Sequence, residues 1–194
     1  MRRPLRLPIA PILFAVALAA LAPASPAAAA SHPHTRQGWL VGIGLGAGGL
    51  QVGDSGVSSN RETGGVGSLR AGYAFNSKLS LELDGTAWTR DDQGTRFTFA
   101  VSGVGLNFYP GESGLVLRAG VGGGTGKVEQ QQGNVTVSAT ENGLGLMGGI
   151  GYEFRVTPRF ALGPQVNVGW ADLDSFNADW FTGELAVCWY FIKR

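Results

Sequence analysis

From Gly38 onward, apolar residues alternate with glycine, polar or charged residues in segments of about ten residues. In one segment Leu79, Leu81 and Leu83 alternate with polar residues. Successive side chains of a β-strand point to opposite faces, so this alternation predicts strands with one apolar face. About ten residues are enough for a tilted strand to cross a bilayer. The pattern therefore predicts an all-β chain and favours a transmembrane β-barrel.

Eight alternating segments can be counted, at about residues 39–47, 68–75, 79–88, 97–109, 115–122, 144–155, 160–170 and 181–191. Three short turns, at 76–78, 110–114 and 156–159, alternate with four longer polar loops at 48–65, 90–95, 126–137 and 171–178. This arrangement predicts an eight-stranded antiparallel up-and-down transmembrane β-barrel, with its short turns and both termini in the periplasm and its four loops outside the cell.

The fourth segment breaks the alternation. Phe97, Phe99 and Val101 share one phase, whereas the apolar residues of 104–108 share the other. One extra residue in a strand reverses the facing of every residue beyond it. The sequence therefore predicts a β-bulge near 102–103.

The polar phase of the segments carries charges of nearly balanced sign. They are Arg70, Glu82, Asp84, Arg118, Glu153, Arg155 and Glu184. The interior of an eight-stranded barrel is just wide enough for side chains to fill, and buried charges require partners. We therefore expect these residues to form an interior charge network that plugs the barrel, with the apolar phase facing lipid. In the alternative, a soluble barrel, the two faces are reversed.

Aromatic residues favour the membrane barrel. Those next to the short turns or the chain termini are Trp39, Tyr73, Phe75, Phe108, Tyr109, Tyr152, Phe154, Phe160, Trp189 and Phe191. Membrane barrels carry girdles of aromatic residues where their walls cross the membrane interfaces. The sequence predicts such a girdle on the periplasmic side.

Residues 1–30 have the features of a secretory signal peptide, with Arg2, Arg3 and Arg6 before the apolar run Ile9–Leu21 and a small-residue site at Ala30. Residues 31–37 then form an N-terminal linker, and 38–194 form the barrel. The 15 Lys and Arg residues against 14 Asp and Glu give no reason to expect nucleic acid as a partner. A single cysteine, Cys188, makes no internal disulfide.

The sequence offers little chemistry for catalysis. Its only histidines, His32 and His34, flank a proline beside the expected cleavage site, in a segment without strand pattern. No His and Cys cluster has metal-ligand spacing, so we expect no metal and no cofactor. An enzyme would have to use a loop Asp or Ser without histidine, and the chain is interpreted as not an enzyme.

Two stretches, 143–154 (GLGLMGGIGYEF) and 181–191 (FTGELAVCWYF), resemble the small outer-membrane barrels of the OmpA/OmpX type, the outer membrane protein β-barrel domain. The resemblance implies secretion to the outer membrane of a Gram-negative bacterium, with lipid and the barrel insertion machinery as partners. It also implies that the last strand is the insertion signal, through Phe181, Gly183, Leu185, Val187, Trp189 and Phe191. Residues 192–194 follow Phe191, whereas the family ending is the aromatic residue itself.

Two functional hypotheses remain. In the first, the barrel is a structural or surface-interaction protein that meets an extracellular partner through its four loops. In the second, it binds or conducts a small apolar molecule, either as a narrow outer-membrane conduit or as a soluble periplasmic carrier. The direction of Leu79, Leu81 and Leu83 separates the carrier from a membrane barrel.

Overall fold

The computed structural model describes residues 36–54, 57–58, 60–111, 113–132 and 135–191. The expected signal peptide, His32 and His34 lie outside these residues. Eight long strands make up most of the described chain: β1 (Gly38–Asp54), β3 (Glu62–Asn76), β4 (Leu79–Asp92), β5 (Thr95–Phe108), β6 (Leu115–Gln132), β7 (Val135–Tyr152), β9 (Phe160–Leu173) and β10 (Asn177–Phe191). Two short strands complete the set: β2 (Val57–Ser58) pairs with the end of β1, and β8 (Phe154–Thr157) continues β7 beyond Glu153.

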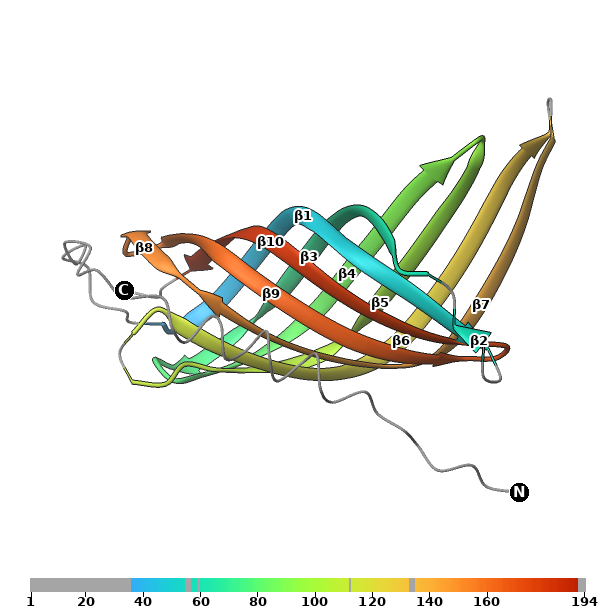
Figure 1. The fold of residues 1–194 in the computed structure, drawn as a ribbon. Helices are drawn as coiled ribbons and strands as arrows, with labels where there is room; N and C mark the ends of the chain where they lie inside the picture. Colours follow the sequence, from blue (N-terminus) through green and yellow to red (C-terminus); the bar gives the residue numbers. More distant parts are fainter. Residues whose placement is uncertain (1–35, 55–56, 59, 112, 133–134, 192–194) are drawn as a thin grey trace, which may run out of the picture.

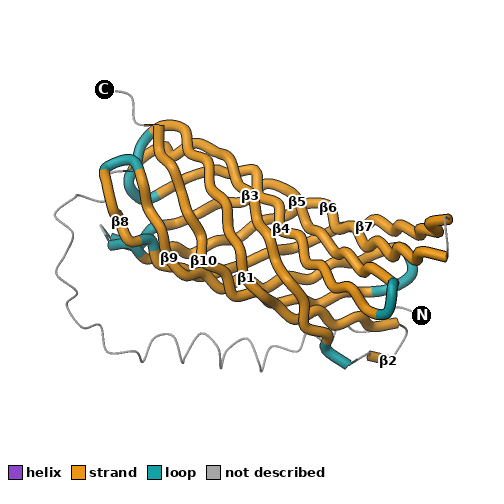
Figure 2. The backbone as a smooth tube through the Cα atoms, turned by 90° about the horizontal axis from the view of Figure 1, so that it is seen from above, coloured by secondary structure: helices purple, strands orange, loops and turns teal. Residues whose placement is uncertain are grey.

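Each long strand pairs antiparallel with the next along the chain, and β10 pairs with both β9 and β1. This last pairing closes the sheet into a barrel (Figures 1 and 2). The predicted eight-stranded antiparallel barrel is confirmed. Within the described ranges, no helix combines the length and apolar character needed to cross a membrane.

The apolar phase of the strands faces outward. Leu45, Leu69 and Leu83 are 71%, 62% and 65% exposed, whereas residues of the opposite phase are buried inside. A belt of exposed large apolar side chains around a barrel is a lipid-facing surface. Because Leu81 and Leu83 belong to this belt, the faces are arranged as in a membrane barrel and not as in a soluble carrier.

The predicted β-bulge is wrong. β5 pairs with β4 and β6 in one unbroken register from Thr95 to Phe108. Phe99 and Val101 therefore point into the barrel, where they are buried, while Val104 faces outward. The apolar residues change phase along this strand because part of the interior is itself apolar.

The predicted long loops are mostly strand, which corrects the boundaries given by the sequence. Only Gln93 and Gly94 connect β4 to β5, both with positive φ, at 46° and 84°. Two successive positive φ values are typical of a tight β-hairpin turn. Outside a bilayer both faces of a strand meet water, so the alternation that reveals a strand in the membrane disappears there.

The two ends of the barrel differ. At one, here called the turn end, short connections at 77–78, 109–114 and 158–159 join the strands. At the other, the hairpin end, β4–β5 and β6–β7 project well beyond the barrel (Figure 1). Pairing of β3 with β4 stops at Thr89, and pairing of β9 with β7 starts at Gly143. The segments beyond these pairs form what we call the protruding sheet, made of residues 90–92, 95–97, 126–132 and 135–142.

Candidate functional site

The interior of the turn end is built around the carboxylate of Glu153, which lies between β7 and β8. Tyr190 donates a hydrogen bond to Glu153 Oε2 at 2.8 Å, and Arg36 Nε lies 3.2 Å from the same oxygen. Arg70 Nη2 is 3.7 Å from Glu153 Oε1. Two strands, β3 and β10, and the segment before β1 thus meet at one buried carboxylate.

Arg36 closes the turn end, although it lies within residues 31–37, which the sequence predicts as a linker. Its guanidinium lies 3.8 Å from the ring centroid of Tyr109 and donates to the carbonyls of Ser77 and Ser113, at 3.4 and 3.3 Å. These carbonyls belong to two of the three short connections. Only its position just before the first strand could have drawn attention to Arg36 in the sequence.

The seven residues expected to form the interior charge network have buried or largely buried side chains inside the barrel, and most of them meet in pairs. Arg118 Nη1 lies 3.4 Å from Asp84 Oδ2, and Arg70 Nε lies 3.9 Å from Glu82 Oε2. Arg155 lies 3.9 Å from the ring centroid of Tyr190. These seven residues carry three positive and four negative charges, and Arg36 supplies the positive charge that balances them.

Glu184 is held differently from the other carboxylates. Ser68, Gln165, Asn167 and Thr182 donate hydrogen bonds to its two oxygens. All four donors are neutral, and no ion pair to Glu184 occurs among the described residues. Buried carboxylates can be stabilised by several such donors without a counter-charge.

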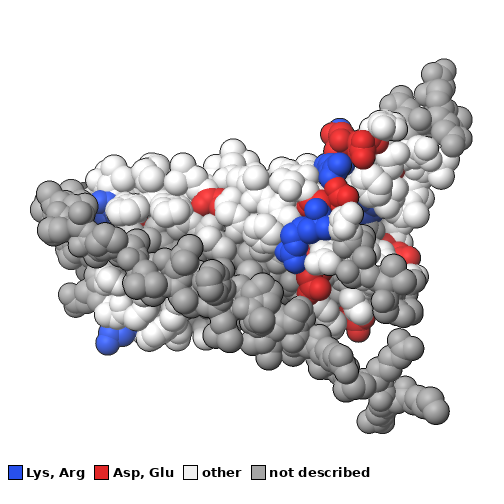
Figure 3. All heavy atoms as spheres, viewed as in Figure 1, with Lys and Arg blue, Asp and Glu red and all other residues white. Residues whose placement is uncertain are grey.

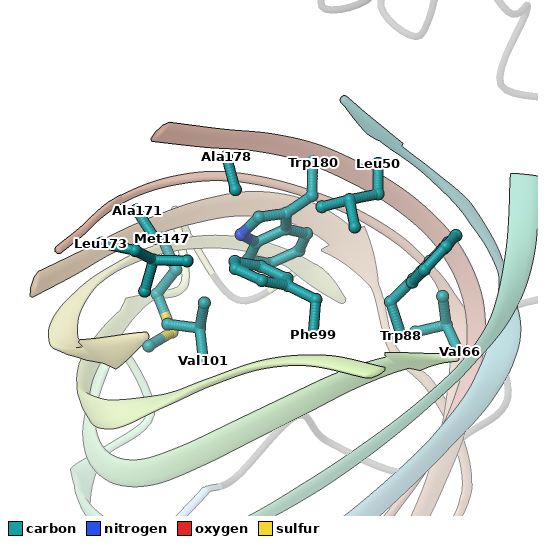
Figure 4. Close-up of a cluster of buried hydrophobic side chains, with 10 residues drawn as sticks. All are labelled: Leu50, Val66, Trp88, Phe99, Val101, Met147, Ala171, Leu173, Ala178 and Trp180. Carbon is teal, nitrogen blue, oxygen red and sulfur yellow. The ribbon is translucent and has the colours of Figure 1, made fainter. Parts of the chain in front are cut away.

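The interior of the hairpin end is apolar, which corrects the expectation of an entirely polar plug. Its buried cluster is Leu50, Val66, Trp88, Phe99, Val101, Met147, Ala171, Leu173, Ala178 and Trp180 (Figure 4). β6 contributes glycines there instead of side chains, and a Cβ atom at Gly124 would lie 2.8 Å from the Ala171 Cβ. Glycines on this strand therefore make room for side chains from other strands, such as Ala171 and Leu173 of β9.

The barrel is thus filled at two levels, by a charged network at the turn end and an apolar cluster at the hairpin end. A cavity of about 10 Å³ remains beside Arg70, Glu153, Pro164 and Cys188. That volume has room for about one water molecule. Within the described part of the chain, no group of three His, Cys, Asp or Glu side chains could hold a metal ion.

The residues of the expected insertion signal all lie on β10. Phe181, Leu185, Trp189 and Phe191 are exposed on the lipid-facing side, as is Gly183, while Val187 is half-buried. Their recognition by insertion machinery stays a prediction.

Aromatic rings surround the turn end in contacting pairs: Trp39 with Tyr73, Tyr73 with Phe75, Tyr152 with Phe154, and Phe160 with Trp189. Tyr109 is an exception to the predicted girdle, because its ring lies inside the barrel beneath Arg36. Its outward neighbour Phe108 is 45% exposed. The side chains of these two adjacent aromatic residues therefore point to opposite faces of the barrel wall, Phe108 outward and Tyr109 inward.

Charged side chains gather at the hairpin end, and the wall below it shows few of them (Figure 3). Arg96 Nε lies 2.8 Å from Asp91 Oδ1, and Lys127 Nζ lies 2.7 Å from Glu129 Oε1. The hydrogen bond from Arg96 lowers the pKa of Asp91 below its usual value. The protruding sheet therefore carries charged side chains that form ion pairs.

Residues 14–185 match the family described as "Outer membrane protein beta-barrel domain". No curated protein matches the chain. Among solved structures, Ail, the attachment invasion locus protein of Yersinia pestis, in complex with the heparin analogue sucrose octasulfate, is 16% identical, with a TM-score of 0.60 over 78% of this chain and 99% of that one. Neisserial surface protein A is 20% identical, with a TM-score of 0.56 over 79% and 97% of the two chains. These likenesses show a shared fold.

Proposed function

Because the chain belongs to the outer membrane protein β-barrel domain family, we propose that it is a closed barrel that serves in surface contact through its hairpin end. In this arrangement the turn end and both termini lie in the periplasm. The barrel wall holds the protruding sheet above the membrane, where it meets an extracellular partner. The expected cleavage of residues 1–30 belongs to the same proposal.

One observation carries this function: the interior is filled at two levels while a four-stranded sheet projects beyond the wall. A conduit for a small apolar molecule needs a continuous passage, and Phe99, Met147 and Trp180 occupy the passage in the hairpin half. The buried ionisable groups are likewise shut off from any substrate. The filled interior therefore supports a non-enzymatic role at the surface over transport or catalysis.

The ligand of the Ail structure, sucrose octasulfate, is a polyanion, and the charges of this chain argue against a similar ligand here. Described side chains at the hairpin end include eight acids (Glu62, Asp91, Asp92, Glu129, Glu141, Asp172, Asp174 and Asp179) and four bases (Arg61, Arg90, Arg96 and Lys127). An acidic surface repels polyanions and attracts basic partners. The proposed partner is therefore not a polyanion.

Shortening the two hairpins tests this function. Replacing residues 90–97 and 126–141 each by Asn-Gly removes the protruding sheet but keeps the pairs Thr89–Thr98 and Thr125–Asn142 at the rim. The shortened barrel should still insert and should migrate differently on gels before and after boiling. Cells that display it should lose adhesion to immobilised cells and matrix proteins, relative to cells with the full chain. Equal adhesion of both would overturn the proposal.

A further inference from the structure

Two tight turns at the turn end are built alike, and each ends in a basic residue. The turn that ends at Lys78 joins β3 to β4, and the turn that ends at Arg159 joins β8 to β9. The Lys78 amide donates a hydrogen bond to Asn76 Oδ1 at 2.8 Å, and the Arg159 amide donates one to Thr157 Oγ1 at 3.3 Å. The two basic residues therefore occupy equivalent positions in two hairpins.

The backbone of each basic residue is fixed to the barrel, whereas its side chain is exposed. The amide of Tyr109 donates to the Lys78 carbonyl at 2.8 Å, and the amide of Tyr190 donates to the Arg159 carbonyl at 2.7 Å. Neither basic side chain has an ion pair among the described residues. Both charges are thus held in place at the rim and are available to a ligand from outside the chain.

Aromatic pairs accompany both turns. Phe75, near the end of β3, contacts Tyr73, with ring centroids 5.6 Å apart. Phe160 directly follows Arg159 and contacts Trp189, with ring centroids 5.8 Å apart. Girdles of aromatic residues mark the level at which a barrel wall meets the lipid headgroups. Because both turns are short, their basic residues lie close to that level.

The surface charge of the turn end is opposite in sign to that of the hairpin end. Glu153 is the only acidic residue of the described turn end, and its side chain is buried. Figure 3 shows basic side chains at this end, separate from the mixed charges of the hairpin end. Basic residues close to a membrane surface attract anionic lipids. The turn end therefore favours an anionic ligand from the leaflet that surrounds it.

We propose that Lys78 and Arg159 each bind the phosphate-bearing headgroup of an anionic phospholipid, with its acyl chains along the aromatic girdle. β10 and β1 lie between the two hairpins, so the two sites are separate. A zwitterionic headgroup binds more weakly, because it carries a positive charge of its own beside the phosphate. This inference goes beyond the proposed surface function, because it assigns lipid binding to the opposite end of the barrel.

Native mass spectrometry of the full chain in a nonionic detergent tests the proposal. The probe is dioleoylphosphatidylglycerol, and the control is dioleoylphosphatidylcholine, which has the same acyl chains but a zwitterionic headgroup. Phosphatidylglycerol should occupy two sites on each barrel. Its affinity should exceed that of phosphatidylcholine by about threefold or more, the scale of a modest exposed charge pair. Equal affinities of the two lipids would overturn the proposal.

Substitutions at the two turns locate the sites. Lys78→Gln and Arg159→Gln should each reduce the number of bound phosphatidylglycerol molecules from two to one, and the double variant should remove both. The matched control, R96Q/K127Q, removes two basic residues from the protruding sheet and changes the net charge equally. This control should leave binding unchanged. Equal effects of the two double variants would show attraction by overall charge and would contradict the assigned sites.

Two further controls make the result specific. All variants should keep their gel shift, because the hydrogen bonds that hold the two turns come from backbone amides and from Asn76 and Thr157. Glycerol 3-phosphate carries the headgroup phosphate without acyl chains and should not displace phosphatidylglycerol at equal concentration. Displacement would mean that phosphate alone is recognised, and the assignment to lipid would be wrong.

The outcomes separate this inference from the proposed function. The lipid measurement uses neither cells nor the protruding sheet, so a negative result would leave the surface function standing. If cells with shortened hairpins keep their adhesion while phosphatidylglycerol binds as expected, the surface function fails and the two lipid sites stand.

Discussion

Arg36 and Glu153 lie 117 positions apart in the sequence, and Arg36 Nε lies 3.2 Å from Glu153 Oε2 inside the turn end of the barrel. Arg36 precedes β1, and Glu153 separates β7 from β8. This contact therefore ties the start of the described chain across the interior to the far wall. It requires the register of the closed barrel.

Arg36→Ala should destabilise the barrel by about 3–5 kcal/mol, because removing one partner of a buried ion pair leaves the other charge uncompensated. Urea unfolding in detergent micelles, followed by tryptophan fluorescence and gel shift, measures the free energy. The unfolding free energy of Arg36→Lys should fall between those of the wild type and the alanine variant. Lysine keeps the charge but not the planar guanidinium that reaches Ser77 and Ser113. An alanine variant as stable as the wild type would contradict this account of the turn end.

Neutralising two buried glutamates should have unequal effects. Glu153→Gln leaves Arg36 and Arg70 without their shared carboxylate and should cost several kcal/mol, at about the scale of a broken buried pair. Glu184→Gln should cost much less, because its partners are neutral groups that can exchange donor and acceptor roles. The same unfolding experiment compares the two variants. Equal losses of unfolding free energy would argue against different environments for the two carboxylates.

Two substitutions in β5 distinguish its regular register from a bulge. Phe99→Ala removes a ring from the apolar cluster and should cost about 3–5 kcal/mol through lost burial and a residual cavity. Val104→Ala should cost far less, since that side chain is on the outer surface and its loss leaves no cavity. A larger loss for Val104→Ala would mean that the facing of the strand is reversed.

Cysteine labelling on intact cells determines the orientation of the barrel. In a Cys188→Ala background, Ser138→Cys on the protruding sheet should react at once with a membrane-impermeant maleimide. Thr157→Cys, next to a short connection, should react only after the outer membrane is permeabilised. Both positions are exposed, so access to the reagent decides the result. The reverse order of labelling would place the hairpins in the periplasm.

The Asp91–Arg96 pair predicts a particular pH response of the β4–β5 hairpin. The folded-state pKa of Asp91 is lowered, first by the hydrogen bond from Arg96. The pair is therefore fully formed above the ordinary aspartate pKa and weakens only as pH falls through the lower, folded-state pKa. The Asp91 carboxyl resonance should not change between pH 7 and pH 5, and Arg96→Gln should raise its midpoint. An unchanged midpoint in that variant would show that Arg96 does not lower the pKa of Asp91.

The sequence alone predicted the eight strands, their antiparallel order and the facing of most of their side chains. This was possible because a strand that crosses a bilayer separates lipid from a narrow interior, and the two environments select different residues at alternating positions. The same rule predicted the seven interior charges, since a charge on the polar phase of such a strand has no other place to lie.

Only the tertiary structure decided the rest. The alternation carries no information where both faces of a strand meet water. The strands of the protruding sheet are therefore predicted as loops, and only their pairing in the structure identifies them as strands. The alternation also misleads where the interior is apolar, as at Phe99 and Val101. Arg36 lies outside any pattern, and its partners come from distant parts of the chain. Such contacts depend on closure and register, which are set by pairing between strands and not by the local order of residues.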